Sequence, residues 1–349
     1  MLILNDLHLS VQRKGGTTPV SQEALRGFLY GSLATLLDAS PEDHLLINGD
    51  LMDGFDVATR DWLDAYLLFS PWLAKGKRLT LVAGNHDWVA RGDKVSSFEA
   101  LGAVLKTAYP DAVTVVGINE SSTVAPGVLA IAHHANQDLF DAALEKALAL
   151  AGSYHTLLLH CNLNNRFAQQ SDNSLDLSDS MARKFKDIGV HILLAHEHNH
   201  RIVGNVTVLG CQWPTSIADC LDSPEKFAHT LTGSVLMKLI TWSADGPKGY
   251  TQLDWRGLAD YTGSHGFIRI AGGAKSSEAA EVINTISKFR QKSGALVISN
   301  AVAIDGMVQA EDLPSSFEAA KAFDVVAFVH KHLDVRETAT FDKLLEQSA

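Results

Sequence analysis

Five short clusters of carboxylate, amide and imidazole side chains each follow an apolar run of the chain. They lie at 6–8, 49–53, 84–87, His160 and 196–198. Oxygen and imidazole donors without a thiolate suit Mn²⁺, Fe²⁺ or Zn²⁺ better than Ca²⁺. Two such ions about 3.5–4 Å apart can activate a water molecule and clamp the non-bridging oxygens of a phosphate. The clusters therefore predict a centre for two divalent ions that acts on a phosphoester.

The spacing within the clusters supports this prediction. Asp6 and His8 are two residues apart, so their side chains point to the same side of an extended segment and can reach one ion. His196 and His198 repeat that spacing. Asp50 follows the next apolar run, and its two oxygens can bridge two cations.

Two candidate ligands stand in less distinctive surroundings. Asn85 offers a neutral carbonyl oxygen, which adds a ligand without adding charge. His160 is a single residue, and His133 or His134 could take its place. The run 157–159 directly before His160 favours His160. His133 and His134 also follow an apolar run, so they are candidate substrate contacts in the cleft.

The elements that must position these residues alternate between strand and helix. A helix is predicted at 23–37 from its apolar periodicity. Short apolar runs predict strands at 1–5, 44–48, 79–83, 113–116, 128–132, 156–159, 191–195 and 206–209. Such alternation indicates an α/β fold, and ligands that follow successive strands converge at the carboxyl edge of a sheet.

The character of the chain changes after about residue 225. A strand is predicted at 266–270, an amphipathic helix at 277–291 and a second strand from 294 to 304, with none of the metal-type clusters. The apolar tail at 323–333 is typical of a terminal or docking helix. We therefore expect two domains, at 1–225 and 226–349, the second being a small α/β domain.

Composition narrows the class of protein. The hydrophobic content is 46%, the charged content is 20%, and the formal net charge is −11. That charge argues against a generally basic nucleic-acid surface, although bound cations would offset part of the acidic excess. No apolar stretch approaches the ~18–20 residues of a membrane span, and the first residues lack a secretory signal. Three cysteines without CxxC spacing favour a reducing cytoplasm.

Taken in order, the clusters resemble the DxH, GDxxD, GNHD, H and GHxH pattern of the calcineurin-like metallophosphoesterases. The resemblance covers about residues 1–215, and it departs from the pattern at Ala195, where the family has glycine. It implies a β-sandwich core flanked by helices in αββα layers, followed by a small C-terminal α/β capping domain.

The resemblance also implies a role for each residue of the pattern. The first metal ion would be held by Asp6, His8, Asp50 and His198. The second would be held by Asp50, Asn85, His160 and His196. His86 would be the catalytic general acid or phosphate-contacting group, steadied by Asp53. Histidine suits that role because it exchanges a proton near neutral pH.

The order of segments after the last cluster is similar to that of nuclease subunits of the SbcCD type, including their phage versions. The segments compared are 210–216, 226, 234–241 and 322–329. This similarity implies a Mn²⁺-dependent DNA exo/endonuclease that hydrolyses phosphodiester bonds with metal-activated water. Fe²⁺, Zn²⁺ and Mg²⁺ remain alternatives. It also implies an SMC-like ABC ATPase partner and a location in the cytoplasm of a bacterium or of a virus-infected bacterial host.

Several alternatives stay open at this point. The chain could instead be a stand-alone phosphatase, a small-molecule or nucleotide phosphodiesterase, or a non-catalytic scaffold. Basic loop residues could bind DNA or could be ordinary solvated charges: Arg13, Lys14, Arg91, Lys94, Arg166 and Arg201. The apolar segments 57–69 and 325–333 could form a homodimer interface.

Overall fold

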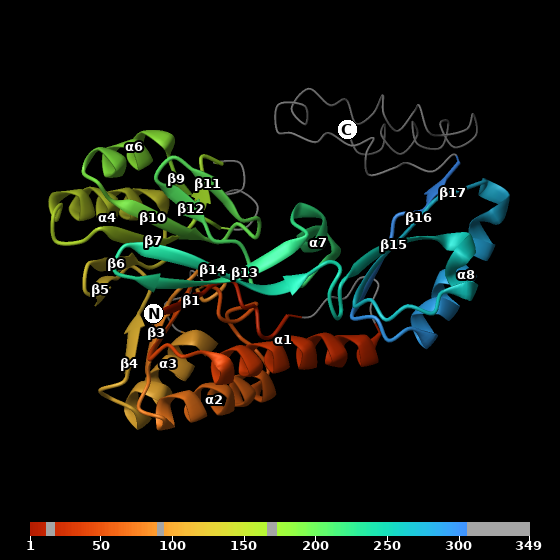
Figure 1. The fold of residues 1–349 in the computed structure, drawn as a ribbon, viewed down its shortest axis with the longest axis horizontal. Coiled ribbons are helices and arrows are strands. Elements are labelled where there is room, and N and C mark those ends of the chain that lie inside the picture. The colour runs from red at the N-terminus through yellow and green to blue at the C-terminus, as the bar shows by residue number, and fades with distance from the viewer. Residues whose placement is uncertain (12–17, 89–93, 166–172, 306–349) are drawn as a thin grey trace, which may run out of the picture. The chain divides into compact units, whose positions relative to one another are not determined.

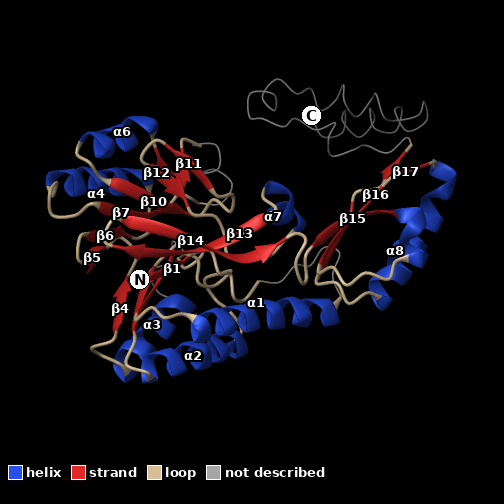
Figure 2. Cartoon of the chain, in the orientation of Figure 1, coloured by secondary structure: helices blue, strands red, loops and turns tan. Residues whose placement is uncertain are grey.

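The computed structural model describes residues 1–11, 18–88, 94–165 and 173–305. The chain divides into two compact units. The first comprises Met1–Thr251 with the short segments Gly263–Ile268 and Gly294–Ile298. The second comprises Gln252–Thr262, Arg269–Ser293 and Ser299–Ala349, of which residues from 306 onward lie outside the described part. Figure 1 and Figure 2 show the elements of each unit.

The first unit contains two large mixed sheets. The first sheet has the order β14-β13-β1-β2-β3-β4. Its strands are β1 (Leu2–Leu4), β2 (His44–Asn48), β3 (Arg78–Val82), β4 (Val113–Val116), β13 (Glu225–Thr232) and β14 (Val235–Ser243). Strands β1 to β4 are parallel, whereas β13 runs antiparallel to β1 and β14 antiparallel to β13.

The second sheet has the order β11-β12-β10-β7-β6-β5. Its strands are β5 (Ser121–Ala125), β6 (Val128–Ile131), β7 (Thr156–His160), β10 (His191–Ala195), β11 (Arg201–Val203) and β12 (Val206–Val208). The four inner strands are parallel and the two edge strands antiparallel. A short pair, β8 (Asn162–Leu163) and β9 (Asp176–Leu177), lies outside both sheets.

Period-two alternation along the strands of the second sheet explains its two faces. In β7, Leu158 joins the core that contains the first sheet, whereas Leu157 and Leu159 join the core on the helix-covered face. In β10, Leu193 and Ile192 divide in the same way. Alternate residues of a strand point to opposite faces, so both faces of this sheet are buried.

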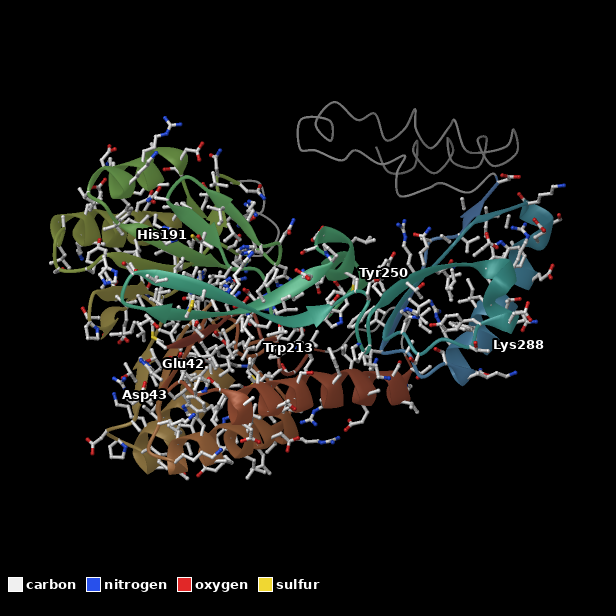
Figure 3. All side chains as sticks on the ribbon, in the orientation of Figure 1. Glu42, Asp43, His191, Trp213, Tyr250 and Lys288 are labelled. Carbon is white, nitrogen blue, oxygen red and sulfur yellow. The ribbon has the colours of Figure 1, made fainter. Side chains whose placement is uncertain are left out.

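Helices cover the outer faces of the sandwich. The first core takes in buried residues of α1 (Pro19–Ala39), α2 (Thr59–Ala74) and α3 (Ser97–Ala108). The second core takes in α4 (Gln137–Ala149) and α6 (Asp179–Asp187). Side chains fill the space between the layers, including Trp213 of the first core (Figure 3). The expected αββα sandwich is therefore confirmed for this unit.

Helix α1 begins four residues before the predicted start at 23. Thr18 is its N-cap and accepts a hydrogen bond from the Ser21 backbone N–H at 3.2 Å, and Pro19 occupies the first turn. Both features favour a helix start, because proline has no N–H to leave unpaired and the hydroxyl satisfies a free donor. The core face of α1 is a leucine stripe at Leu25, Leu29 and Leu33.

The C-terminal region contains the predicted strand–helix–strand order. Its elements are β15 (Tyr250–Asp254), η1 (Trp255–Asp260), β16 (Phe267–Ala271), β17 (Gly273–Ala274), η2 (Ser276–Glu278), α8 (Ala279–Lys292), β18 (Val297–Asn300) and β19 (Ala303–Ile304). Strands β15, β16 and β18 form one small sheet and β17 pairs with β19. Helix α8 buries Val282 and Ile286. The predicted helix at 323–333 lies outside the described residues.

The first compact unit extends beyond the expected boundary at residue 225. Strand β13 starts there and pairs with β1 at Leu2–Thr230 and Ile3–His229, so the hairpin that follows belongs to the first sheet. The interval 226–251 is thus part of the core, whereas the role of the remaining segment as a capping domain stays a prediction. Within the described segments, no helix combines the length and the apolarity needed to span a bilayer.

Candidate metal centre

All five predicted clusters lie at the carboxyl ends of parallel strands in the first unit. The clusters follow β1, β2 and β3 of the first sheet and β7 and β10 of the second. The two sheets meet at this edge: His160 Nδ1 donates to the Asn48 carbonyl at 3.0 Å, and Asn48 Nδ2 donates to the Leu159 carbonyl at 3.0 Å. The sandwich thus brings ligands from both sheets to one place.

The backbone at the ligand positions adopts an unusual conformation. Asp6 (φ 49°), His8 (φ 43°), Asp50 (φ 49°) and His196 (φ 86°) all have positive φ although none is glycine. Such residues cost free energy and concentrate at functional sites, where the surroundings hold them in place. Backbone hydrogen bonds supply that support here, from Asp6 N to the Gly49 carbonyl and from His8 N to the Asp50 carbonyl, each 3.1 Å.

Two glycines of the clusters are required by close approach. A Cβ added to Gly49, which has φ 84°, would lie 1.9 Å from His160 Nδ1. A Cβ added to Gly84 would lie 2.2 Å from Asp50 Oδ1. Ala195, the departure from the family pattern, is the last residue of β10 and is fully buried opposite His160. Its φ is not positive, so alanine fits this position without strain.

Each of the two central carboxylates has one oxygen held by the protein and the other directed at the centre. Asp6 Oδ2 accepts from Asn5 Nδ2 at 2.5 Å and from His196 N at 3.1 Å. Asp6 Oδ1 is buried and has no hydrogen-bond partner among the described residues. Asp50 Oδ1 accepts from His86 N at 3.0 Å. A buried carboxylate oxygen without a donor is costly unless a cation binds it.

Asp50 Oδ2 occupies the middle of the centre. It lies 3.2 Å from His160 Nε2 and 4.0 Å from Nε2 of both His8 and His86. Asn85 Oδ1 lies 3.1 Å from the same His160 nitrogen. This position matches the bridging role expected of Asp50, because one of its oxygens faces imidazoles from both predicted ligand sets.

The imidazoles direct Nδ1 outward to protein acceptors. His160 Nδ1 is bound to the Asn48 carbonyl, and His198 Nδ1 lies 2.8 Å from Asp219 Oδ1. His8 Nδ1 lies 3.0 Å from Asp53 Oδ1 as an ion-pair contact, without the geometry of a hydrogen bond. A histidine that donates its Nδ1 hydrogen keeps the lone pair on Nε2, and this is the tautomer that binds a metal ion.

The donor set fits two divalent ions. Ligand atoms lie within 4.8 Å of one another in two separate triplets, Asp6 with His8 and His198, and Asp50 with His160 and His196. These are subsets of the two sets expected from the resemblance. Oxygen and imidazole donors of this kind suit hard and borderline divalent ions.

The electrostatics of the centre also favour a cation. Burial would lower the pKa of His160, but the Asp50 and Asp6 carboxylates outweigh it and raise that pKa to about 10. Burial would raise the pKa of Asp50, but the imidazoles of His160, His8 and His86 hold it well below its usual range. Two buried carboxylates thus stabilise positive charge between the sheets.

His86 differs from the ligand histidines in exposure. Its side chain is 36% exposed, compared with 6% for His8 and 0% for His160. Burial would lower its pKa, but the charge of Asp50 and the Asp53 carbonyl raise it above the usual value. These interactions favour the protonated form of His86 on the open side of the centre.

The predicted His86–Asp53 pair exists through the main chain. His86 Nδ1 is 2.9 Å from the Asp53 carbonyl oxygen. The Asp53 carboxylate instead faces His8, as described above, while its backbone N–H donates to Ser10 Oγ at 3.0 Å. Asp53 therefore holds two imidazoles, one with its backbone and one with its side chain.

Asp87 and Asp219 are site residues to which sequence reasoning gave no role. Asp87 Oδ2 accepts from the backbone N–H of Asp50 at 3.1 Å and of Gly84 at 2.9 Å, so it ties two ligand turns together. Burial and the nearby Asp50 charge raise the pKa of Asp87 to about 7. Asp87 stands in the GNHD block and could have been considered from its position, whereas Asp219 lies far from every cluster.

The two candidate substrate contacts, His133 and His134, are buried. His133 is 1% exposed and its ring lies 6.0 Å from that of Trp88. His134 is 4% exposed, its Nδ1 donates to the Ala132 carbonyl at 2.8 Å, and its ring lies 6.0 Å from that of Phe140. Substrate contact stays a prediction for both histidines.

The structure describes two of the six basic residues that we expected to bind DNA. Arg13, Lys14, Arg91 and Arg166 lie outside the described residues. Arg201 forms an ion pair with Glu197 at 2.5 Å, and Lys94 is exposed. Their contact with a nucleic acid also stays a prediction.

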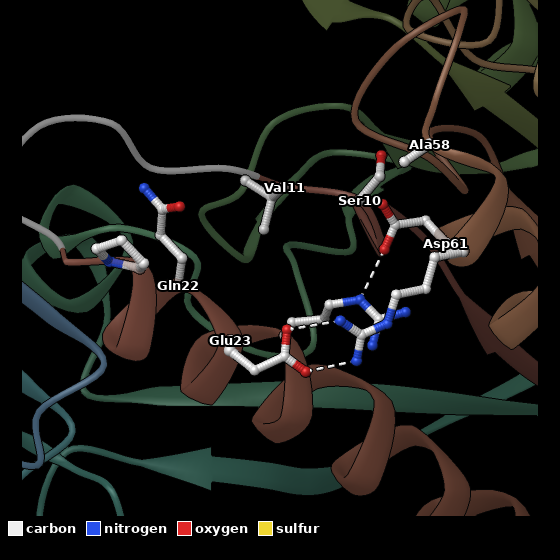
Figure 4. A pocket seen from close by; sticks show the side chains of 9 residues that line it. Ser10, Val11, Gln22, Glu23, Ala58 and Asp61 are labelled. Carbon is white, nitrogen blue, oxygen red and sulfur yellow. Dashed lines mark hydrogen bonds and ion pairs between the residues drawn. The ribbon is translucent and has the colours of Figure 1, made fainter.

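A cavity of about 230 Å³ lies beside Ser10, between α1 and the start of α2 (Figure 4). Arg26 Nε donates to Asp61 Oδ1 at 2.7 Å, and Arg60 Nη2 donates to Glu23 Oε1 at 2.6 Å. Both arginines of this wall are paired with carboxylates, so the cavity is a weaker candidate for phosphate binding than the metal centre.

Comparison with known proteins gives the following similarities. Residues 1–208 match the family described as calcineurin-like phosphoesterase. Among solved structures, a cold-active protein-tyrosine phosphatase of a psychrophilic Shewanella species is 13% identical, with 69% of this chain and 77% of that chain covered and a TM-score of 0.34. A protein of unknown function from Aquifex aeolicus is 16% identical, with 54% and 92% covered and a TM-score of 0.25. No curated protein matches the chain.

Proposed function

The chain belongs to the calcineurin-like phosphoesterase family, and we propose that within this family it is a Mn²⁺-dependent DNA exo/endonuclease of the SbcCD type. The family hydrolyses phosphoesters with a dinuclear divalent centre. The observation that carries the proposal is the pair of ligand triplets, Asp6 with His8 and His198, and Asp50 with His160 and His196, which would supply the metal ligands of a hydrolytic site.

The residues of this chain would divide the work of hydrolysis. Asp6, His8, Asp50 and His198 would hold one ion, and Asp50, Asn85, His160 and His196 the other. Ions held by these residues would supply polarisation of the phosphoryl oxygens and a lowered pKa for an attacking water molecule. His86, exposed beside Asp50 Oδ2 and held at Nδ1 by the Asp53 carbonyl, would donate a proton from Nε2 to the leaving oxygen.

The preference for DNA is supported by the region after the metal centre. The strand–helix–strand order β16-α8-β18 follows the phosphoesterase core, as in the nuclease subunits that the sequence resembles. This segment contributes none of the metal-ligand clusters among the described residues. It is therefore available to position a polymeric substrate, which a small phosphoester would not need.

The test compares substrates under one metal condition. Purified protein with Mn²⁺ is incubated with end-labelled single- and double-stranded DNA, and separately with bis-p-nitrophenyl phosphate and nucleotides. We expect DNA degradation that EDTA abolishes and that the His86→Ala variant lacks. Turnover of the small esters without DNA degradation would contradict the nuclease proposal and leave the phosphoesterase assignment intact.

One observation favours a second candidate, a stand-alone phosphatase or a small-molecule or nucleotide phosphodiesterase. The chain has a formal net charge of −11, and Arg201 near the last ligand cluster is already paired with Glu197. A DNA-binding face usually has an excess of positive charge. DNA binding measured at low and high salt distinguishes the two. A nuclease should bind DNA with an affinity that falls as the salt concentration rises, whereas a small-molecule enzyme should not bind DNA.

The partners follow from the same proposal. We propose an SMC-like ABC ATPase bound by the C-terminal region, whose segment 306–349 lies outside the described residues. A homodimer through α2 is supported by two exposed leucines, Leu63 (46%) and Leu67 (55%). Light scattering of the wild-type protein and of the Leu63→Glu variant tests the dimer, which we expect the charge to disrupt. A cytoplasmic location is proposed with these partners.

A further inference from the structure

Asp219 lies against a ligand histidine although it belongs to none of the sequence clusters. Its Oδ1 is 2.8 Å from His198 Nδ1, and the two side chains are 6% and 25% exposed. Asp219 is in α7 (Ile217–Asp222), beyond the residues that match the family. We infer that Asp219 is a positioning residue that fixes His198 in its metal-binding tautomer.

The orientation of Asp219 is set by its second oxygen. Oδ2 accepts from the Thr215 backbone N–H at 2.8 Å, the Thr215 hydroxyl at 3.1 Å and the Ser216 backbone N–H at 2.9 Å. These three donors hold the carboxylate so that Oδ1 faces the imidazole. An ionised carboxylate only accepts hydrogen bonds, so His198 Nδ1 must carry the hydrogen and Nε2 keeps its lone pair.

The histidine itself is held on its other side by the backbone. The His198 carbonyl accepts from Lys226 Nζ at 3.1 Å and from Cys211 N at 3.3 Å. Lys226 is 2% exposed and comes from β13, so the first sheet anchors this turn of the second sheet. Because the backbone and Nδ1 of His198 are both held by hydrogen bonds, the orientation of the imidazole ring and of its Nε2 lone pair is fixed.

His198 and His160 differ in the kind of acceptor that binds Nδ1. The acceptor for His160 Nδ1 is the main-chain carbonyl of Asn48, which no side-chain substitution removes. The acceptor for His198 is a side chain, so its contribution can be measured. The inference rests on the metal-binding role proposed for His198 and is independent of whether DNA is the substrate.

The decisive variant is Asp219→Asn. If the amide oxygen stays with the Thr215 and Ser216 donors, the NH₂ group faces His198 Nδ1 and requires an acceptor there. The imidazole hydrogen then moves to Nε2, and the lone pair needed for a metal ion is lost. We expect ¹⁵N-histidine NMR of the metal-free protein to show this change of tautomer. We also expect Mn²⁺ titration calorimetry to show one site weakened by about 10–100-fold.

The matched control is Asp222→Asn, the same chemical change on the same helix. Asp222 is the last residue of α7 and is exposed. We expect wild-type Mn²⁺ affinity and an unchanged His198 tautomer. This separates the loss of one negative charge on α7 from the positioning of His198.

Each result has a defined meaning. Wild-type Mn²⁺ affinity and tautomer in Asp219→Asn would overturn the inference, as would equal weakening in Asp222→Asn. If the wild-type protein binds Mn²⁺ and the variant loses it while DNA is not cut, the inference holds and the substrate proposal fails. If the wild-type protein binds no divalent ion, the metal assignment fails, and an unchanged tautomer in the variant would overturn the inference as well.

Discussion

Histidines stand at the starting ends of two parallel strands and also at the carboxyl ends of the sandwich, and the two ends give them opposite chemistry. Strand β2 starts at His44 and leads to Asp50, and β10 starts at His191 and leads to His196. At the starting ends the rings contact hydroxyls: His44 Nε2 lies 2.9 Å from Thr80 Oγ1, and His191 Nε2 lies 3.0 Å from Thr207 Oγ1. His191 is labelled in Figure 3.

The two ends differ in the charge that their histidines carry. Burial lowers the pKa of His44 to about 4 and also lowers the pKa of His191, so both stay neutral. At the carboxyl ends the Asp50 and Asp6 carboxylates overcome burial and raise the pKa of His160. His44 and His191 are thus kept neutral at the starting ends, whereas the carboxylates at the carboxyl ends stabilise positive charge on His160.

The largest effect is expected from Asp50→Asn, which removes the negative charge facing both ligand sets. Asp50 Oδ2 contacts imidazoles of both sets, so we expect both ions to be lost. Activity should fall by more than the roughly 100-fold typical of losing an outer-shell partner. Metal analysis after dialysis and a hydrolysis assay measure these effects.

The control for Asp50 is Asp38→Asn, an exposed carboxylate of α1 with 77% of its side chain accessible. We expect wild-type metal content and activity from it. Retention of two ions in Asp50→Asn would show that the bridge is assigned to the wrong residue.

Much of this comparison could be predicted from the sequence, because parallel strands bring their carboxyl ends together. Asp6, Asp50 and His160 each follow an apolar run, and the structure places their side chains in contact. The same reasoning gave His44 and His191 no metal role, since each begins its run.

Other features depend on tertiary packing that no local pattern encodes. Asp219 reaches His198 across 21 residues from a helix of six residues. The Asp53 side chain faces His8, whereas the Asp53 carbonyl accepts from His86 Nδ1. This arrangement depends on the geometry of the turn. The place of the hairpin after residue 225 in the first sheet depends on the pairing of β13 with β1, which joins segments about 230 residues apart.

The second largest effect is expected from His86→Ala, which changes the open side of the centre without removing a metal ligand. General acid catalysis contributes about 10²–10⁴-fold, so we expect a loss of that size with DNA or an alkyl diester and two ions retained. A p-nitrophenyl leaving group needs little protonation, so the loss should be smaller with bis-p-nitrophenyl phosphate. Equal loss with both substrates, or loss of an ion, would contradict the assigned role.

A smaller effect is expected from Gly49→Ala at the same end of the sandwich. The added Cβ would meet His160 Nδ1, and the positive φ of Gly49 adds strain. We expect a loss of stability of about 1–3 kcal/mol, with weaker metal binding because His160 must move. Urea unfolding and calorimetry measure the two effects. Gly54→Ala is the control, since Gly54 has no heavy atom within 4 Å of its Cβ position and no positive φ.

The smallest effect is expected at the opposite end, where His44 stays neutral. Its folded pKa of about 4 lies below the usual 6.5, so the unfolded chain binds more protons between these values. The stability that depends on neutral His44 is complete above pH 6.5 and is lost as the pH falls towards 4. At pH 5 the loss should be about 1–2 kcal/mol.

The test compares urea unfolding at pH 7.5 and pH 5 for the wild-type protein and His44→Gln, with EDTA present so that metal binding does not contribute. Glutamine cannot titrate and can still form a hydrogen bond with Thr80. We expect the variant to lose less stability than the wild-type protein over this interval. An equal loss in both proteins would mean that His44 titrates alike in the folded and unfolded chains. The contrast between the two strand ends would then be confined to the metal edge.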